Sequence, residues 1–228
     1  MSMREYSVFD ILGPIMVGPS SSHTAGAARI GKVARYIAGN DFNLVTFYLH
    51  GSFAKTYKGH GTDKALVAGI LGMEPYDENL KDSLRIAEEK GIKVSFLEAD
   101  LGIQHENTVK IVFKNIDGTN TEVTGSSIGG GNILVTNVDG YKVKMTGDHP
   151  TLIVVQNDKK GVISKVTSVL SQKDINIGIM KVKRKKKGVE AYMIIETDDE
   201  ITKEVVEQLK NTENVLEVKV INPVKTRW

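Results

Sequence analysis

The sequence predicts an α/β (α+β) fold in two domains, a mixed α/β domain over residues 1–147 and a smaller βαββαβ domain over residues 148–228. Three observations predict it. Apolar residues recur at helical spacing up to residue 90, and extended segments bounded by Gly, Asn and Asp follow from residue 93. Beyond Gly147-Asp148-His149-Pro150, the order strand, helix, strand, strand, helix, strand is that of a ferredoxin-like unit.

Helices come first in the first domain. Apolar residues at 27, 30, 33, 34 and 37 predict a helix that the serines at 20–22 can cap and Gly39-Asn40 ends. A buried strand is expected at 44–49. Thr62 is expected to cap a second helix that runs to residue 71, and a third helix is expected over 79–90.

Strands follow in both domains. Residues 93–97, 108–114, 121–126 and 132–137 predict antiparallel strands at the end of the first domain. In the second domain we expect strands at 151–156, 175–183, 189–197 and 215–221, and helices at 162–172 and 201–210.

Composition excludes several classes of protein. The 30 Lys and Arg against 28 Asp and Glu leave a net charge of +2, which gives no argument for nucleic acid or a membrane as partner. No apolar run approaches the ~20 residues of a membrane span, so we expect a cytoplasmic protein. Cysteine is absent, so we expect no metal site, zinc or iron–sulfur, held by this chain's own thiolates.

Two glycine-rich stretches resemble nucleotide motifs without meeting their requirements. In the stretch from Gly26 to Lys32, Val33 stands where a P-loop needs Ser or Thr, and the glycines fall inside a helical stripe. Gly129-Gly130-Gly131 lacks the dinucleotide spacing, so we expect a turn or a backbone that another group approaches closely. The basic run at 181–187 is expected to be a solvated hairpin.

Two polar helix starts carry histidine. Gly18-Pro19-Ser20-Ser21-Ser22-His23-Thr24 places hydroxyls beside free backbone N–H groups, with Arg29 nearby, which suits a carboxylate or phosphate. The alternative, an N-cap with solvated neighbours, explains the pattern equally well. His60 lies between two glycines before a second helix start, where the helix dipole favours a neutral, basic imidazole. A turn histidine with one hydrogen bond is the alternative there.

A family resemblance combines these stretches. It is carried by SVFDILGPIMVGPSSSHTAGAARIG, GSFAKTYKGHGTDKA, HENTVKI, SIGGGNI and the C-terminal unit, which together resemble the β chain of bacterial iron–sulfur-dependent L-serine dehydratase. The first domain also resembles the substrate-binding module of some D-3-phosphoglycerate dehydrogenases. The second domain resembles the ACT regulatory domain.

The resemblance implies an L-serine ammonia-lyase that forms pyruvate and ammonia without pyridoxal phosphate. A [4Fe-4S] cluster would act as Lewis acid, and its cysteines would belong to a separate α subunit, without which this chain is inactive. The implied catalytic residues are His60, as base or proton relay, and His23. The implied substrate-binding residues are Ser20, Ser21, Ser22, Thr24, Lys64 and Asp63.

The resemblance also implies homodimerisation through the ACT domain and an effector site there. Asn176 matches the Asn that begins the second ACT strand, and the turn after the first strand supplies Asn157, Asp158 and Gly161. Lys160 and Asp158 depart from the pattern of serine-binding turns, so a different effector or a cation is equally expected. The alternative to an enzyme subunit is a regulatory subunit that senses an amino acid or anion without catalytic residues.

Overall fold

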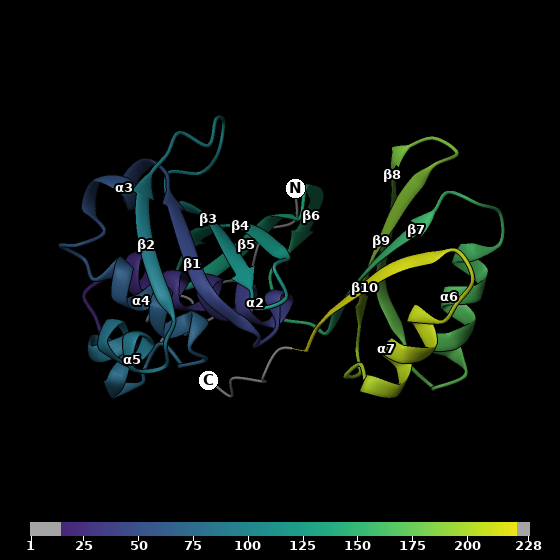
Figure 1. Cartoon of the computed structure of the whole chain (residues 1–228), viewed down its shortest axis with the longest axis horizontal. Helices are drawn as coiled ribbons and strands as arrows, with labels where there is room; N and C mark the ends of the chain where they lie inside the picture. Colours follow the sequence, from purple (N-terminus) through teal and green to yellow (C-terminus); the bar gives the residue numbers. More distant parts are fainter. Residues whose placement is uncertain (1–14, 223–228) are drawn as a thin grey trace, which may run out of the picture. The chain divides into compact units, whose positions relative to one another are not determined.

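The computed structural model describes residues 15–222, so residues 7–14 of the first motif lie outside the described residues. Two compact units divide between Thr146 and Gly147, and each is described by itself (Figure 1). Within residues 15–222, no helix is both long and apolar enough to cross a membrane.

The first unit contains a six-stranded sheet in the order β2-β1-β3-β4-β5-β6. Its strands are β1 (Phe42–Leu49), β2 (Lys93–Glu98), β3 (Thr108–Asn115), β4 (Asn120–Gly129), β5 (Asn132–Val138) and β6 (Tyr141–Met145). The prediction that the strand at 93–97 is antiparallel is wrong, because β2 runs parallel to β1. Helices intervene between these two strands, and such a crossover returns the chain in the same direction.

The helices of the first unit pack against this sheet and against one another (Figure 1). They are the π-helix η1 (Ser21–Gly26), α2 (Ala27–Ala38), α3 (Gly51–Thr56), α4 (Thr62–Ile70), the 3₁₀ helix η2 (Glu78–Asp82) and α5 (Ser83–Glu89). The predicted helix over 79–90 is therefore two elements, and α3 is not among the predicted helices. Six residues are too few to show a helical period in the sequence.

Two glycines explain the apparent P-loop. Gly31 of α2 and Gly69 of α4 face each other where these helices cross. A Cβ built on Gly31 would lie 2.4 Å from the Leu66 carbonyl oxygen, and one built on Gly69 would lie 2.2 Å from that of Ala28. Glycine is therefore needed for close helix packing, and no phosphate loop is present at this position.

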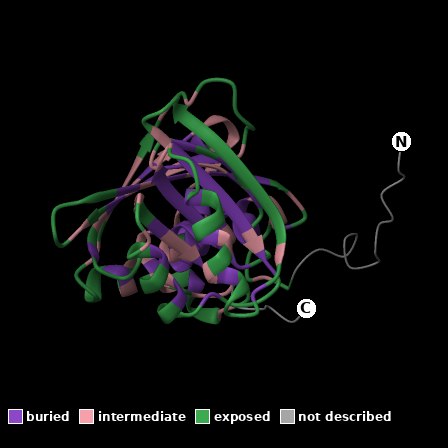
Figure 2. Cartoon of the chain, turned by 90° about the vertical axis from the view of Figure 1, so that its right-hand side faces the viewer, coloured by how far each residue is buried: buried purple, intermediate pink, exposed green. Residues whose placement is uncertain are grey.

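The second unit has the predicted ferredoxin-like order. An antiparallel sheet, β10-β7-β9-β8, consists of β7 (Thr151–Asn157), β8 (Ile177–Lys186), β9 (Glu190–Thr197) and β10 (Val215–Ile221). Helices α6 (Val162–Ser171) and α7 (Lys203–Lys210) supply Val166, Leu170, Val205 and Leu209 to its core. The edge strand β8 is exposed along nearly its whole length, as the basic run at 181–187 predicts (Figure 2).

Candidate active site

His23 lies near the start of the helix formed by η1 and α2. Ser20 caps this helix, because its Oγ accepts a hydrogen bond from the His23 backbone N–H at 3.1 Å. A π-helix is a rare element that is frequent at functional sites. Only 9% of His23 is exposed, so its imidazole is enclosed by protein.

Three hydroxyl groups surround the His23 imidazole. Ser52 Oγ lies 3.4 Å from Nε2, and Thr56 Oγ1 lies 3.4 Å from Nδ1. These two residues are four positions apart on α3, so they project from one face of that helix. Thr62 Oγ1 lies 3.3 Å from Nδ1. The prediction that Thr62 caps α4 is wrong, because Gly61 occupies the N-cap in the left-handed conformation and leaves the Thr62 hydroxyl to face His23.

His60 lies beside His23 and is exposed. The two ring centroids are 4.8 Å apart, and the rings are tilted by 43°. His60 Nδ1 lies 3.3 Å from the Thr56 carbonyl oxygen. Phe53 also packs against His23, with ring centroids 5.1 Å apart in an edge arrangement. The structure therefore brings together the two histidines that the sequence places 37 residues apart.

Burial makes His23 a weaker base than a free imidazole. Loss of solvent lowers its pKa below the ordinary value, and the neighbouring His60 lowers this pKa further. A hydrogen bond with the Asn107 side chain acts in the opposite direction. The net effect keeps His23 neutral at pH 7, which is the resting state that a general base requires.

The segment before β3 anchors α3 beneath His23. The Ser52 N–H donates to the Glu106 carbonyl at 2.8 Å, and Gly51 has a positive φ of 57°. A Cβ built on Gly51 would lie 2.6 Å from that same carbonyl oxygen. Ser52, Thr56 and Asn107 are functional candidates that motif reasoning missed. The HENTVKI and GSFAKT stretches contain them, but no residue spacing indicates that they meet at His23.

Glycines also set how closely the helix approaches the sheet. A Cβ built on Gly26 would lie 2.1 Å from Ser127 Oγ of β4. The three glycines at 129–131 have positive φ values and form the β4–β5 turn. Arg29, which the sequence associated with an anion, donates from Nη1 to the Gly131 carbonyl at 3.2 Å. The expectation of a turn at these glycines is confirmed.

The other predicted substrate-binding residues differ in their surroundings. Ser21 and Ser22 are half-buried in the π-helix with His23. Thr24 is buried, and its Oγ1 has no hydrogen-bond partner among the residues described. Asp63 Oδ1 accepts from the Lys64 backbone N–H at 2.8 Å. Within residues 15–222, neither Asp63 nor Lys64 hydrogen-bonds to His23 or His60.

In the second unit, Asp158 and Gly161 line a hollow of about 780 Å³. Four cationic side chains also line it, those of Lys159, Lys160, Arg184 and Lys187. The Asp158 carboxylate accepts from the Gly188 N–H at 2.7 Å and from Arg184 Nε. These donors lower the pKa of Asp158, with the Gly188 N–H as the largest cause. Because these donors already occupy part of the carboxylate, fewer of its lone pairs are available for a cation, and the nature of the effector stays a prediction.

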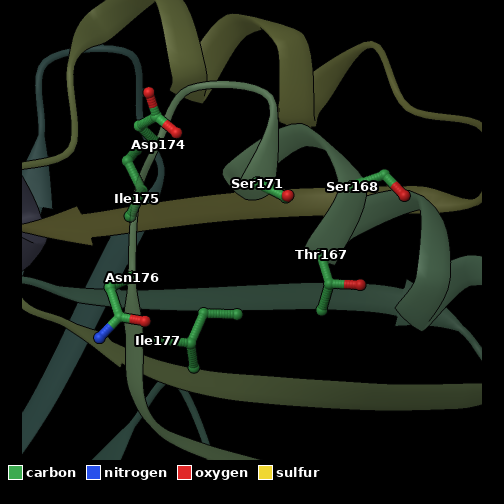
Figure 3. Close-up of a pocket in the computed structure, with 7 residues that line it drawn as sticks. All are labelled: Thr167, Ser168, Ser171, Asp174, Ile175, Asn176 and Ile177. Carbon is green, nitrogen blue, oxygen red and sulfur yellow. The ribbon is translucent and has the colours of Figure 1, made fainter.

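Asn176 lies at a second hollow, of about 540 Å³. Figure 3 shows Asn176 and Ile177 at the start of β8, with Thr167, Ser168 and Ser171 on α6. The pairing register puts Asn157 beside the other end of β8, through Glu190 and Lys186. A ten-residue strand spans roughly 30 Å, so one copy does not bring Asn176 together with Asn157 and Asp158.

Comparisons with known proteins identify the family of this chain. Residues 7–138 match the family model "Serine dehydratase beta chain", and residues 151–214 match "ACT domain". A protein described as a probable L-serine dehydratase, beta chain, from Bacillus subtilis is 46% identical over 95% of this chain and 98% of its own length. An L-serine dehydratase, beta chain, from Peptoniphilus asaccharolyticus is 42% identical over 96% of this chain and 99% of its own.

This chain belongs to the serine dehydratase β-chain family. The resemblance that the sequence motifs carry is thereby confirmed, together with the α/β fold and its ACT domain. The second resemblance also has support, since a D-3-phosphoglycerate dehydrogenase from Methanocaldococcus jannaschii is 28% identical over 86% of this chain and 37% of its own length. The cluster around His23 lies within the residues that match the serine dehydratase β-chain model.

Proposed function

We propose that this chain is the β subunit of an L-serine ammonia-lyase and that it binds L-serine and moves protons during its conversion to pyruvate and ammonia. The observation that carries the proposal is the enclosed His23, neutral at pH 7, beside the exposed His60, at 4.8 Å between ring centroids. A buried neutral base next to an accessible imidazole is suited to removing and relaying a proton. The half-buried hydroxyls of η1 supply hydrogen bonds for the substrate.

The proposal assigns the [4Fe-4S] cluster to a separate α subunit. The sequence contains no cysteine, and residues 15–222 contain no group of three or more His, Asp or Glu placed to hold a metal ion. The residues present therefore do not fit an iron–sulfur cluster. We propose that an α subunit ligates the [4Fe-4S] cluster, and that the β chain alone does not turn over L-serine.

The ACT domain is proposed to pair with a second copy and to bind an effector there. Asn157, Asp158, Gly161 and Asn176 can form one site only if two copies align antiparallel along β8, because they lie at opposite ends of that strand. Such a contact is isologous, as two-fold symmetry requires. The exposed edge carries the apolar Ile179, Met180 and Val182, which are 44%, 38% and 40% exposed.

The test is reconstitution. The β chain, produced alone and together with a cysteine-bearing α chain, is purified without oxygen and assayed for pyruvate from L-serine. We expect the β chain alone to be colourless and inactive, and the complex to be brown, active and sensitive to air. Turnover by the isolated β chain would contradict the division of roles.

One substitution distinguishes the proposed function from the alternative, which is a sensing subunit without catalytic residues. His60→Asn in the assembled complex abolishes most turnover if this chain takes part in the chemistry. A purely regulatory β chain would keep full turnover and lose only its response to the effector.

A further inference from the structure

The two active-site histidines share one neighbour, Thr56 at the end of α3. Its hydroxyl oxygen lies 3.4 Å from His23 Nδ1, and its carbonyl oxygen lies 3.3 Å from His60 Nδ1. The side chain and the backbone of one residue therefore contact the same ring position of both histidines.

Donor and acceptor rules fix the direction of each contact. A carbonyl oxygen only accepts hydrogen bonds, so His60 Nδ1 must carry the proton. The Thr56 hydroxyl has one proton, which it donates to the Ser52 carbonyl at 2.8 Å. This bond to the residue four positions earlier is common for Thr in helices. Thr56 Oγ1 can then only accept from His23 Nδ1, which must also carry its proton.

The other neighbours of His23 are compatible with this direction. The Thr62 hydroxyl can rotate to accept from Nδ1–H, because no other hydrogen bond of Thr62 Oγ1 is found within the described residues. The Asn107 side chain raises the pKa of His23 when its amide oxygen faces the ring, but the amide can turn to present its NH₂ group instead, so it does not fix the tautomer. Thr56 therefore decides the tautomer of His23.

We infer that Thr56 is a positioning residue that holds both His23 and His60 in the Nδ1-protonated tautomer, which leaves Nε2 of each ring as the proton acceptor. His23 Nε2 lies 3.4 Å from Ser52 Oγ, so the Ser52 hydroxyl donates to this basic nitrogen. His23 is buried, whereas Ser52 is half-buried. The Ser52 hydroxyl therefore lies on a route by which a proton can reach His23 Nε2.

The relay step is balanced. As the Ser52 Oγ–H bond breaks, its proton forms a new bond with His23 Nε2. Oγ takes up, with its lone pair, the proton released when the α-carbon–hydrogen bond of the substrate breaks, and the electron pair of that bond stays on the carbon. The Ser52 hydroxyl is thereby regenerated, and the positive charge ends on the His23 imidazolium. This role for Ser52 rests on the proposed function, whereas the tautomer assignment does not.

The tautomers are measured by nitrogen-15 NMR of the full chain with labelled histidine at pH 8, above the ordinary His pKa of ~6.5. His23→Gln and His60→Gln assign the signals. We expect both rings to be protonated at Nδ1. Thr56→Val removes the hydroxyl and keeps the carbonyl, so His23 should become a mixture of tautomers while His60 stays unchanged. Thr56→Ser should restore the His23 pattern.

Two results would overturn the assignment. One is a His23 protonated at Nε2 in the unchanged chain. The other is a His23 tautomer that does not respond to Thr56→Val. His60 is an internal control, since a general disturbance of the fold would alter both rings.

The relay is tested separately with Ser52→Ala. His23 should keep its tautomer, and turnover of the assembled complex should fall by about 10²–10⁴-fold, the usual contribution of acid–base catalysis. Ser95→Ala is the matched control, because it removes a half-buried hydroxyl that donates to Thr46 Oγ1 within the sheet, and it should leave turnover unchanged. Unchanged turnover in Ser52→Ala would refute the relay. The expected tautomers without any pyruvate formation by the complex would instead refute the proposed function.

Discussion

Replacing Gly26 by Ala should displace His23 without touching it. The new Cβ would lie 2.1 Å from Ser127 Oγ and 2.7 Å from Ser127 Cβ, whereas ordinary contacts begin at 3.4 Å. Rotation about χ1 can move the Ser127 hydroxyl aside, but it cannot move Ser127 Cβ, so subtracting 2.7 from 3.4 gives a remaining shift of about 0.7 Å between η1 and β4. His23 lies three residues earlier in the same helix, so it would move by a comparable distance relative to the strand.

A shift of that size has two measurable effects. A misplacement of ~1 Å can reduce turnover by about 10²-fold. Overpacking typically costs about 1–3 kcal/mol, and the better helix propensity of Ala returns about 1 kcal/mol. We therefore expect pyruvate formation by the assembled complex to fall by at least about tenfold, and the unfolding free energy of the β chain to fall by up to about 2 kcal/mol.

The assay needs a matched glycine and a rescue. Gly178→Ala in β8 is the control, since its nearest neighbour would be 3.6 Å away. Ser127→Gly removes both clashing atoms, so in its background Gly26→Ala should cost clearly less stability, as a double-mutant cycle would show. If Gly26→Ala kept both turnover and stability at the level of Gly178→Ala, the close contact would not position His23.

Three further predictions concern the histidines and the ACT domain. His60→Asn should lower turnover of the complex by about 10²–10⁴-fold without changing subunit assembly, which size-exclusion chromatography checks. Because the pKa of His23 is lowered on folding, its contribution to stability is complete above pH ~6.5 and is lost as the pH falls through its folded pKa. His23→Gln should therefore make the unfolding free energy less dependent on pH below ~6.5 than it is in the unchanged chain or in the His149→Gln control. Residues 148–228 should unfold cooperatively when produced alone, because their apolar core is built from their own residues. A non-cooperative transition of this fragment, measured by circular dichroism, would contradict that expectation.

Local sequence patterns predicted most of the elements correctly. The stripes of α2 and α6 and the alternation of β10 are visible because each element buries one face, and burial imposes its period on the sequence. The order of strands and helices in the second domain identified its ferredoxin-like fold, because each of these elements also shows its own period in the sequence. This reasoning did not predict features that are very short or that depend on contacts between distant parts of the chain. The six-residue α3 shows no period, and the parallel pairing of β2 depends on the path of the chain between two strands.

The same distinction between local pattern and tertiary contact applies to the histidines. The sequence alone determined that this chain has no thiolate for a metal, that His23 and His60 each stand at a polar helix start, and which family it belongs to, because these depend on residue identity and local spacing. Only the tertiary structure decided that the two rings lie 4.8 Å apart and that Ser52, Thr56 and Thr62 enclose His23. Their meeting depends on η1, α3 and α4 packing together, which Gly26 and Gly51 permit through close approach to Ser127 and Glu106. Hydrogen-bond direction and desolvation arise only once such groups are in contact, so the pKa and tautomer of His23 are properties of the fold.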